Sequence, residues 1–140
     1  MKKTFLLFLL FGISQMHSQS VLGKWKTIDD KTNQAKSIVE IYESNGKVYG
    51  KVIEIFNEAK RNNTCTKCTG ADKNKPVLGL VIIKGLSKDG EEYSDGKILD
   101  PESGSLYKCM LKLVGKEKLE VRGYMGISLI GRSQTWVRAK

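Results

Sequence analysis

The sequence predicts an all-β fold: a small, closed, antiparallel up-and-down barrel of about eight strands. Short runs of alternating or β-branched residues follow one another along the chain, separated by tight turns. No segment has the apolar period of an amphipathic helix. Gly23 and Trp25 open the first strand, and Trp136 and Arg138 end the last. A small barrel uses such residues to close one end, because the indole plugs the floor and the guanidinium stacks on it.

Residues 1–20 are expected to be a cleaved signal peptide. Lys2 and Lys3 form a charged start, residues 5–13 form an apolar stretch, and a small-residue cleavage pattern follows. The apolar stretch is too short to span a hydrocarbon core of about 30 Å. We therefore expect a periplasmic or secreted protein that is not transmembrane after cleavage, with a single barrel domain at 21–140.

The charge of the chain restricts its partners. Cleavage lowers the formal net charge from +9 to +7, because Lys2 and Lys3 leave with the signal. An exported basic protein meets lipid head groups, envelope polymers and acidic small molecules rather than nucleic acid. The candidate partners are a small anionic or amphipathic ligand and the envelope surface, and nucleic acid is not among them. The charge itself favours a simpler interpretation, in which the lysines only keep the surface soluble and protect strand edges.

The only histidine is His17, which lies within the predicted signal. The mature chain then has no imidazole, which excludes Ser-His-Asp and Cys-His nucleophile systems and zinc sites that need histidine. We predict no catalytic residue, no metal and no cofactor. Enzymatic activity stays an open question, with a non-catalytic role favoured.

The N-terminal half predicts a first strand, a turn at Asp29-Asp30 and then a hairpin. Residues 37–42 and 47–56 are the expected hairpin strands, joined by a tight turn at 44–46. Residues 57–75 have little periodicity and form a mostly polar loop of 19 residues. A loop of that length in a compact domain is usually functional or partly ordered in its own right.

The C-terminal half predicts five further strands, with turns between them that contain Gly, Asp, Pro or Lys. Their expected ranges are 76–84, 91–99, 105–114, 118–124 and 132–138. Alternation places Tyr107, Cys109, Leu111 and Leu113 on one face of their strand. Cys109 is therefore expected to point into the core.

Several sequence strings together resemble one bacterial family. The strings are GKWKTIDD at 23–30, KPVLGL at 75–80, ILDP at 98–101, VRGYMG at 121–126 and LIGRSQTW at 129–136. They look like the domain-of-unknown-function family number 2147, and the resemblance covers essentially the whole mature chain. It implies an exported, lipocalin-like or calycin-type barrel of Gram-negative bacteria and no established activity.

Cys65-Thr66-Lys67-Cys68 in the long loop has several interpretations. A disulfide that staples the loop in an oxidising compartment is favoured. A redox pair needs a thiolate at a helix N-terminus, and no helix pattern follows this motif. A metal site would also need Cys109. The sequence leaves open which of the three cysteines are bonded.

Four polar residues near the C-terminus form the predicted ligand-binding site: Arg122, Tyr124, Arg132 and Gln134. Alternation puts each pair on one face of its strand, and the two strands should pair across the glycine-flanked bend between them. Two arginines on one face repel unless an acid lies between them. That acid could be Asp100 or Glu120, or the carboxylate or phosphate of a ligand. A solvated face with salt bridges is the alternative.

We therefore expect an extracytoplasmic barrel that binds a small amphipathic or anionic ligand, or an envelope component, without catalysis. One alternative is a thiol-disulfide oxidoreductase that uses Cys65 and Cys68. Another is a structural, partner-binding envelope protein whose barrel is completely filled by side chains.

Overall fold

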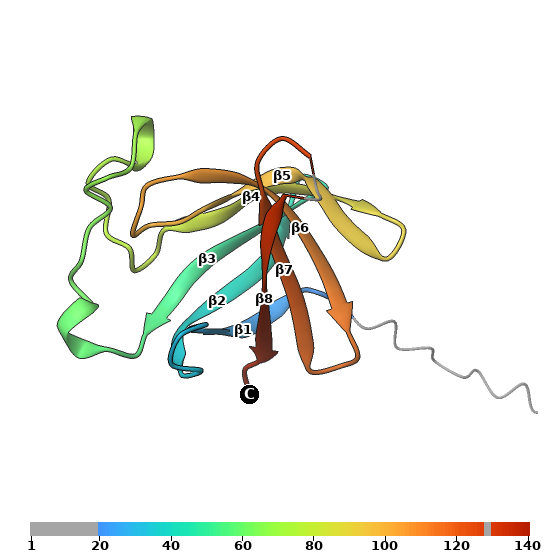
Figure 1. Cartoon of the computed structure of the whole chain (residues 1–140), viewed down its shortest axis with the longest axis horizontal. Helices are drawn as coiled ribbons and strands as arrows, with labels where there is room; N and C mark the ends of the chain where they lie inside the picture. The colour runs from blue at the N-terminus through green and yellow to red at the C-terminus, as the bar shows by residue number, and fades with distance from the viewer. Residues whose placement is uncertain (1–19, 128–129) are drawn as a thin grey trace, which may run out of the picture.

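The predicted fold class is confirmed by a computed structural model that describes residues 20–127 and 130–140. Its eight strands form one closed antiparallel barrel in which each strand pairs with the next and β8 returns to β1 (Figure 1). The strands are β1 (Gly23–Ile28), β2 (Ala35–Ser44), β3 (Lys47–Ile55), β4 (Val81–Asp89), β5 (Glu92–Leu99), β6 (Leu106–Val114), β7 (Lys118–Tyr124) and β8 (Gly131–Arg138). The predicted signal peptide lies outside the described residues, apart from Ser20.

The two ends of the barrel differ in the length of their connections. One end, called the closed end here, carries the short turns at 45–46, 90–91 and 115–117. The other, the open end, carries the loops at 29–34, 56–80, 100–105 and 125–130. Asn45 and Gly46 have φ angles of 51° and 76°. Two positive φ angles in a two-residue turn match the twist of the strands that it joins, which explains why the predicted hairpin forms here.

Trp25 fills the closed end. Its side chain is fully buried, and its indole N–H donates to the carbonyl of Val21 at 2.8 Å. The guanidinium of Arg138 lies over the indole, with its central carbon 4.2 Å from the ring centroid. Trp136 is also buried. The two tryptophans and the charged end of Arg138 therefore occupy the barrel where its first and last strands meet.

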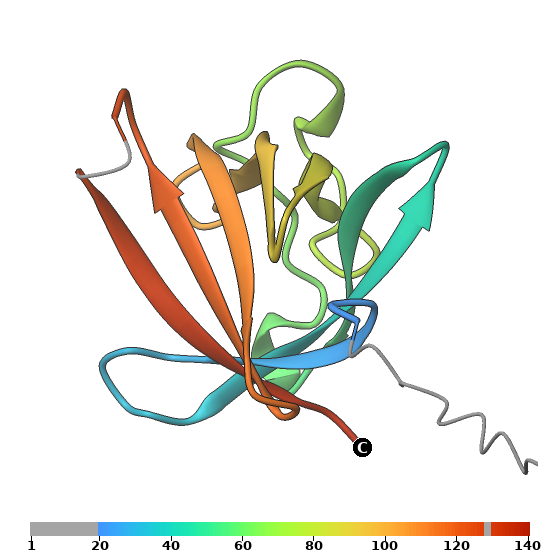
Figure 2. The same cartoon turned by 90° about the vertical axis from the view of Figure 1, so that its right-hand side faces the viewer.

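The ladder that closes the barrel is short. β1 and β8 share two residue pairs, Trp25 with Arg138 and Lys26 with Val137, whereas β7 and β8 share seven. Both views show β8 crossing β1 close to the C-terminus (Figures 1 and 2). The N-terminal part of β8 thus separates from β1 toward the open end.

The expected strand at 76–84 is shifted in the structure. β4 begins at Val81 and continues to Asp89, where Lys88 and Asp89 pair with β5 instead of forming the turn. Gly79 has a φ of 91°, so the chain bends there, and its N–H donates to the carbonyl of Val52 at 2.7 Å. Val77 before the bend and Leu80 after it pack against the core from a loop, which is why this segment resembled a strand.

The loop between β3 and β4 holds two short 3-10 helices, η1 (Glu58–Lys60) and η2 (Gly70–Asp72), and extends beyond the barrel wall (Figure 1). Asp72 anchors it to the wall through an ion pair with Lys84 on β4. The loop also packs on the β5–β6 loop. A Cβ at Gly104 would lie 2.0 Å from the carbonyl oxygen of Lys67, so only glycine fits there.

Candidate ligand-binding site at the open end

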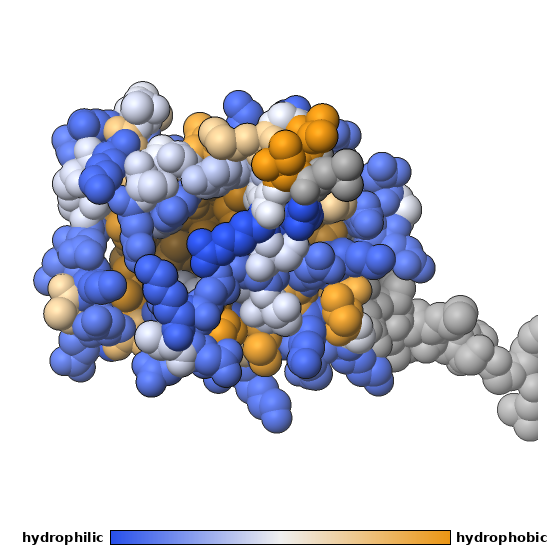
Figure 3. Space-filling view, in the orientation of Figure 1, coloured by the Kyte–Doolittle hydropathy of each residue, from blue (hydrophilic) through white to orange (hydrophobic). Residues whose placement is uncertain are grey.

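The interior of the barrel is packed more completely at the closed end than at the open end. Inward side chains near the closed end are fully buried: Trp25, Val39, Ile41, Leu86, Leu111 and Leu119. The inward positions nearer the open end are mixed, because Ile55, Ile83, Cys109 and Val121 are buried there. The remaining inward positions near the open end are partly buried or exposed: Thr27, Ser37, Ile98, Tyr107, Gly123, Arg132 and Gln134. The space-filling view shows a hollow there, with hydrophobic residues at its bottom and hydrophilic residues around it (Figure 3). The barrel therefore encloses a recess that its own side chains leave open.

Glycine at position 123 helps to keep this recess open. Gly123 lies opposite Cys109 on β6 and Arg132 on β8. A Cβ built on it would lie 3.5 Å from both Ile98 and Tyr107, which is ordinary van der Waals distance. Ile98 and Tyr107 are themselves neighbours across β5 and β6. Ile98 and Tyr107 therefore form an apolar surface on one side of Gly123, and Arg132 lies on the other side.

The four residues of the predicted site lie on two different faces. β7 and β8 pair as expected, but Arg132 is opposite Gly123 and Gln134 is opposite Val121. Arg132 and Gln134 therefore share the inner face with Val121. Arg122 and Tyr124 point to the outer face, where Arg122 donates to Ser133 at 3.0 Å. The common face expected from alternation is wrong, because paired residues on these strands have numbers of opposite parity.

A polar chain connects the inner pair to the β1–β2 loop. The guanidinium of Arg132 forms an ion pair with Asp30, and the amide of Gln134 lies 3.5 Å from the same carboxylate oxygen. The amide oxygen of Gln134 accepts from the indole of buried Trp136 at 3.1 Å. This series of polar contacts spans the side of the barrel on which β8 has separated from β1. It also fixes the orientation of Gln134, while the side chain of Arg132 stays 69% exposed.

Asp30 was missed as a partner of the arginine. The predicted candidates lie elsewhere: Asp100 accepts hydrogen bonds within its own turn, and Glu120 stands on the outer face. The Asp29-Asp30 doublet is the signal that could have revealed it. The N–H groups of Lys31 and Thr32 donate to Asp29 and lower the pKa of its carboxyl group. With Asp29 used by the turn, the second carboxylate is available to a partner across the barrel.

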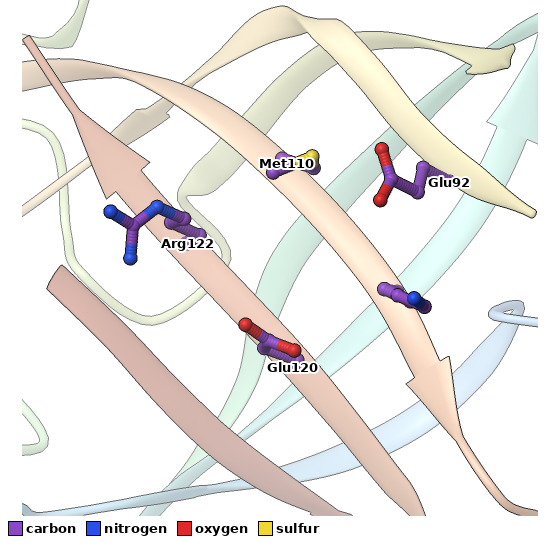
Figure 4. A pocket seen from close by; sticks show the side chains of 5 residues that line it. Glu92, Met110, Glu120 and Arg122 are labelled. Carbon is purple, nitrogen blue, oxygen red and sulfur yellow. The ribbon is translucent and has the colours of Figure 1, made fainter. Parts of the chain in front are cut away.

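The outer face carries a shallow depression of about 200 Å³ over β5, β6 and β7. Figure 4 shows side chains from these three strands around it, among them Glu92, Met110, Glu120 and Arg122. Glu92 is opposite Lys112, which is opposite Glu120, so charges alternate across the strands. This pattern stabilises a sheet surface and leaves little net charge to attract a ligand. It fits the solvated-face interpretation of Arg122.

The cysteine pairing left open by the sequence is resolved. Cys65 and Cys68 are bonded to each other, and both are buried under the β5–β6 loop. Cys109 points into the core, and burial raises the pKa of its thiol to about 12. Within residues 20–127 and 130–140, no cluster of three or more His, Cys, Asp or Glu side chains could hold a metal ion. No helix in these ranges is long and apolar enough to cross a membrane.

Comparison with known families identifies the chain as a whole. Residues 23–138 match the family model described as an uncharacterized protein conserved in bacteria (DUF2147). The chain belongs to this family. Comparison with curated proteins finds no match.

A solved structure has the same fold as this DUF2147 protein. It is described as protein HP1028 from the human pathogen Helicobacter pylori, which belongs to the lipocalin family. The TM-score is 0.77 with 22% sequence identity, over 88% of this chain and 85% of the other. At that identity the likeness establishes a lipocalin-like barrel and nothing about a ligand.

Proposed function

We propose that this protein is an extracytoplasmic binding protein that holds a small amphipathic ligand in the recess at its open end. One observation carries the proposal: the inward side chains are fully buried at the closed end, whereas several nearer the open end, among them Ile98, Arg132 and Gln134, are partly buried or exposed. The apolar part of the ligand lies against Ile98 and Tyr107. Its anionic or polar head lies beside Arg132 and Gln134.

Arg132 suits an anionic head group even though it is paired with Asp30. An exposed ion pair contributes only about 0–1 kcal/mol, so replacing it with a ligand carboxylate or phosphate costs little. Charge-assisted hydrogen bonds from a guanidinium to such a group are among the strongest in proteins. Asp30 holds the guanidinium of Arg132 at the open end of the barrel until a ligand binds.

The apolar surface of the recess provides the remaining affinity. Burying an alkyl chain of about eight carbons contributes roughly 6 kcal/mol before the cost of association is subtracted. The fully packed closed end limits how deep such a chain reaches. We infer a short or medium acyl chain, or a compact ring system, as the apolar part.

Export agrees with this function. The predicted signal peptide and the Cys65–Cys68 disulfide both suit an oxidising compartment outside the cytoplasm. A binding barrel there would meet lipids and their breakdown products. In that compartment the ligand could also come from a component of the cell envelope.

Neither alternative function gains support. A thiol-disulfide oxidoreductase must present a sulfur to its partner, and both sulfurs of the Cys65–Cys68 pair are buried. A completely filled barrel does not agree with the hollow in Figure 3. A reduction potential of the Cys65–Cys68 pair close to that of the compartment would revive the oxidoreductase.

Mass spectrometry of the mature protein, purified gently from its own host, tests the proposal. We expect a discrete additional mass under native conditions that is lost on denaturation. The same measurement on Arg132→Gln should show a lower occupied fraction, while Arg122→Gln, on the outer face, should match the wild type. Equal occupancy in all three proteins would remove Arg132 from the site. Absence of any additional mass would favour a partner-binding role.

A further inference from the structure

The described residues of the β7–β8 loop expose an unusual amount of apolar surface. Met125, Ile127 and Ile130 are 63%, 60% and 68% exposed, more than any other large hydrophobic residue that the structure describes. Turns normally carry Gly, Asn, Asp, Ser or Pro at such positions. Single exposed apolar residues are ordinary, but three on one short loop form a patch of the kind that marks an interaction surface.

A further exposed apolar residue lies on the barrel wall at the open end. Leu106 at the start of β6 is also exposed, and it lies on the same face of its strand as Lys108. The ammonium group of Lys108 donates to the carbonyl of Gly126 in the loop at 3.3 Å. In Figure 3 a group of hydrophobic atoms lies over the β7–β8 loop. Apolar side chains and a cationic group therefore adjoin at the open end.

A row of lysines leads away from the loop across three strands. Lys84 on β4 is opposite Lys97 on β5, which is opposite Lys108 on β6. Like charges directly opposite each other destabilise a sheet, so folding gains nothing from this row. Asp72 neutralises Lys84. Among the described residues, Lys97 and Lys108 have no acidic partner within ion-pairing distance.

We propose that this apolar loop and its lysines dock the protein on an anionic lipid bilayer. Met125, Ile127 and Ile130 would enter the interfacial region of the membrane, while Lys97 and Lys108 contact anionic head groups. Charge complementarity selects this partner over a second copy of the chain. A symmetric contact between two copies would bring the same lysines face to face.

Docking in this way would turn the open end of the barrel toward the lipid. An amphipathic ligand could then pass between the bilayer and the recess without crossing bulk water, which is costly for an apolar chain. The docking surface does not depend on the recess being a binding site. Vesicle binding by an empty barrel is compatible with the proposal.

Sedimentation of the mature protein with vesicles tests the docking. We compare phosphatidylcholine vesicles with vesicles that contain phosphatidylglycerol as well, and expect binding to the second kind only. Replacing Met125, Ile127 and Ile130 with serine should weaken binding at least tenfold without lowering the melting temperature, since these side chains are exposed. The matched control replaces Val114 and Val137, exposed at the closed end, and should bind like the wild type.

The lysines are tested separately. Each cationic residue near an anionic surface contributes about 1 kcal/mol, so Lys97→Gln with Lys108→Gln should weaken binding roughly thirty-fold at low salt. Lys24→Gln with Lys26→Gln removes the same charge from exposed positions on β1 and should have a much smaller effect.

Three outcomes would overturn the docking proposal. Equal binding to neutral and anionic vesicles would remove the role of the lysines. Full binding by the serine variant would remove the role of the loop. Reversible dimerisation in sedimentation velocity, lost in the serine variant and unaccompanied by vesicle binding, would make the patch a contact between copies of this chain.

Discussion

The guanidinium of Arg138 stacks on the indole of Trp25, with 4.2 Å between its central carbon and the ring centroid, where the last strand meets the first. The same guanidinium donates to three backbone carbonyls, those of Ser20, Leu22 and Lys116. One side chain thus joins the segment before β1, the β6–β7 turn and the end of β8. With a ladder of two residue pairs between β1 and β8, these contacts carry much of the barrel closure.

Arg138→Ala should therefore be unusually destabilising for a partly exposed residue. The cation–π contact contributes about 0.5–2 kcal/mol, and hydrogen bonds from a charged group contribute about as much again. We expect a loss of about 2–3 kcal/mol in the free energy of unfolding, measured by urea denaturation. Arg138→Lys should keep part of the stacking and recover less than half of the loss. The control is Lys118→Ala, at an exposed position on the neighbouring strand, which should change the free energy of unfolding by less than about 0.5 kcal/mol. A loss in this control equal to that in Arg138→Ala would disprove the role of Arg138 in closing the barrel.

Gly104→Ala should detach the β3–β4 loop from the β5–β6 loop. Gly104 has a φ of 74°, and a Cβ there would lie 2.0 Å from the carbonyl oxygen of Lys67. Gly46→Ala is a matched control, because Gly46 has a φ of 76° and nothing within 4 Å of its Cβ. Both variants incur about 1–2 kcal/mol of backbone strain. Only Gly104→Ala should make residues 56–80 sensitive to limited proteolysis, and similar cleavage in both would show that the contact is unimportant.

The Cys109 thiol should be unreactive in the folded protein and should weaken the fold at high pH. Its pKa of about 12 exceeds the ordinary value near 8.5 that it regains on unfolding. The associated stability is therefore complete below about pH 8.5 and is lost as the pH rises toward 12, because the unfolded chain releases the proton first. Between pH 9 and 11 the wild type should lose more stability than Cys109→Ala, each compared with its own value at pH 7. Parallel curves would mean that the thiol titrates normally in the fold.

An alkylation assay gives a second measure of the same burial. Without reductant, iodoacetamide at pH 8 should label no thiol of the native protein and only Cys109 after unfolding, because Cys65 and Cys68 are bonded. Labelling of all three cysteines after unfolding without reductant would contradict the disulfide.

The fold could be predicted from the sequence because its signals are local. Alternation along each run, turn residues such as Asn45-Gly46, and the tryptophan and arginine residues on the first and last strands all indicate the same barrel. The pairing of Cys65 with Cys68 was among the interpretations that the loop favoured. These features depend on residues a few positions apart, or on the ends of one closed sheet.

The site could not be predicted in the same way, because it depends on register. Whether Arg122 or Arg132 faces inward is decided by how many residues the β7–β8 connection contains, and a shift of one residue reverses the answer. The contact between Asp30 and Arg132 joins residues about a hundred positions apart and leaves no local pattern. The start of β4 was misplaced for a related reason: Val77 and Leu80, on either side of Gly79, pack on the core without forming a strand.

Filling the recess should abolish ligand binding without unfolding the barrel. In Gly123→Leu the new side chain starts at ordinary contact distance from Ile98 and Tyr107 and extends into the recess between them and Arg132. The probe is 1-anilinonaphthalene-8-sulfonate, an anionic amphipathic dye whose fluorescence rises in apolar sites. The wild type should bind it, Gly123→Leu should not, and Arg132→Gln should bind it about ten- to a hundredfold more weakly, because a charge-assisted contact is lost. Arg122→Gln should bind like the wild type, since this residue lies on the outer face. Undiminished binding by Gly123→Leu, with an unchanged circular dichroism spectrum, would place the dye outside the barrel and refute the recess as the site.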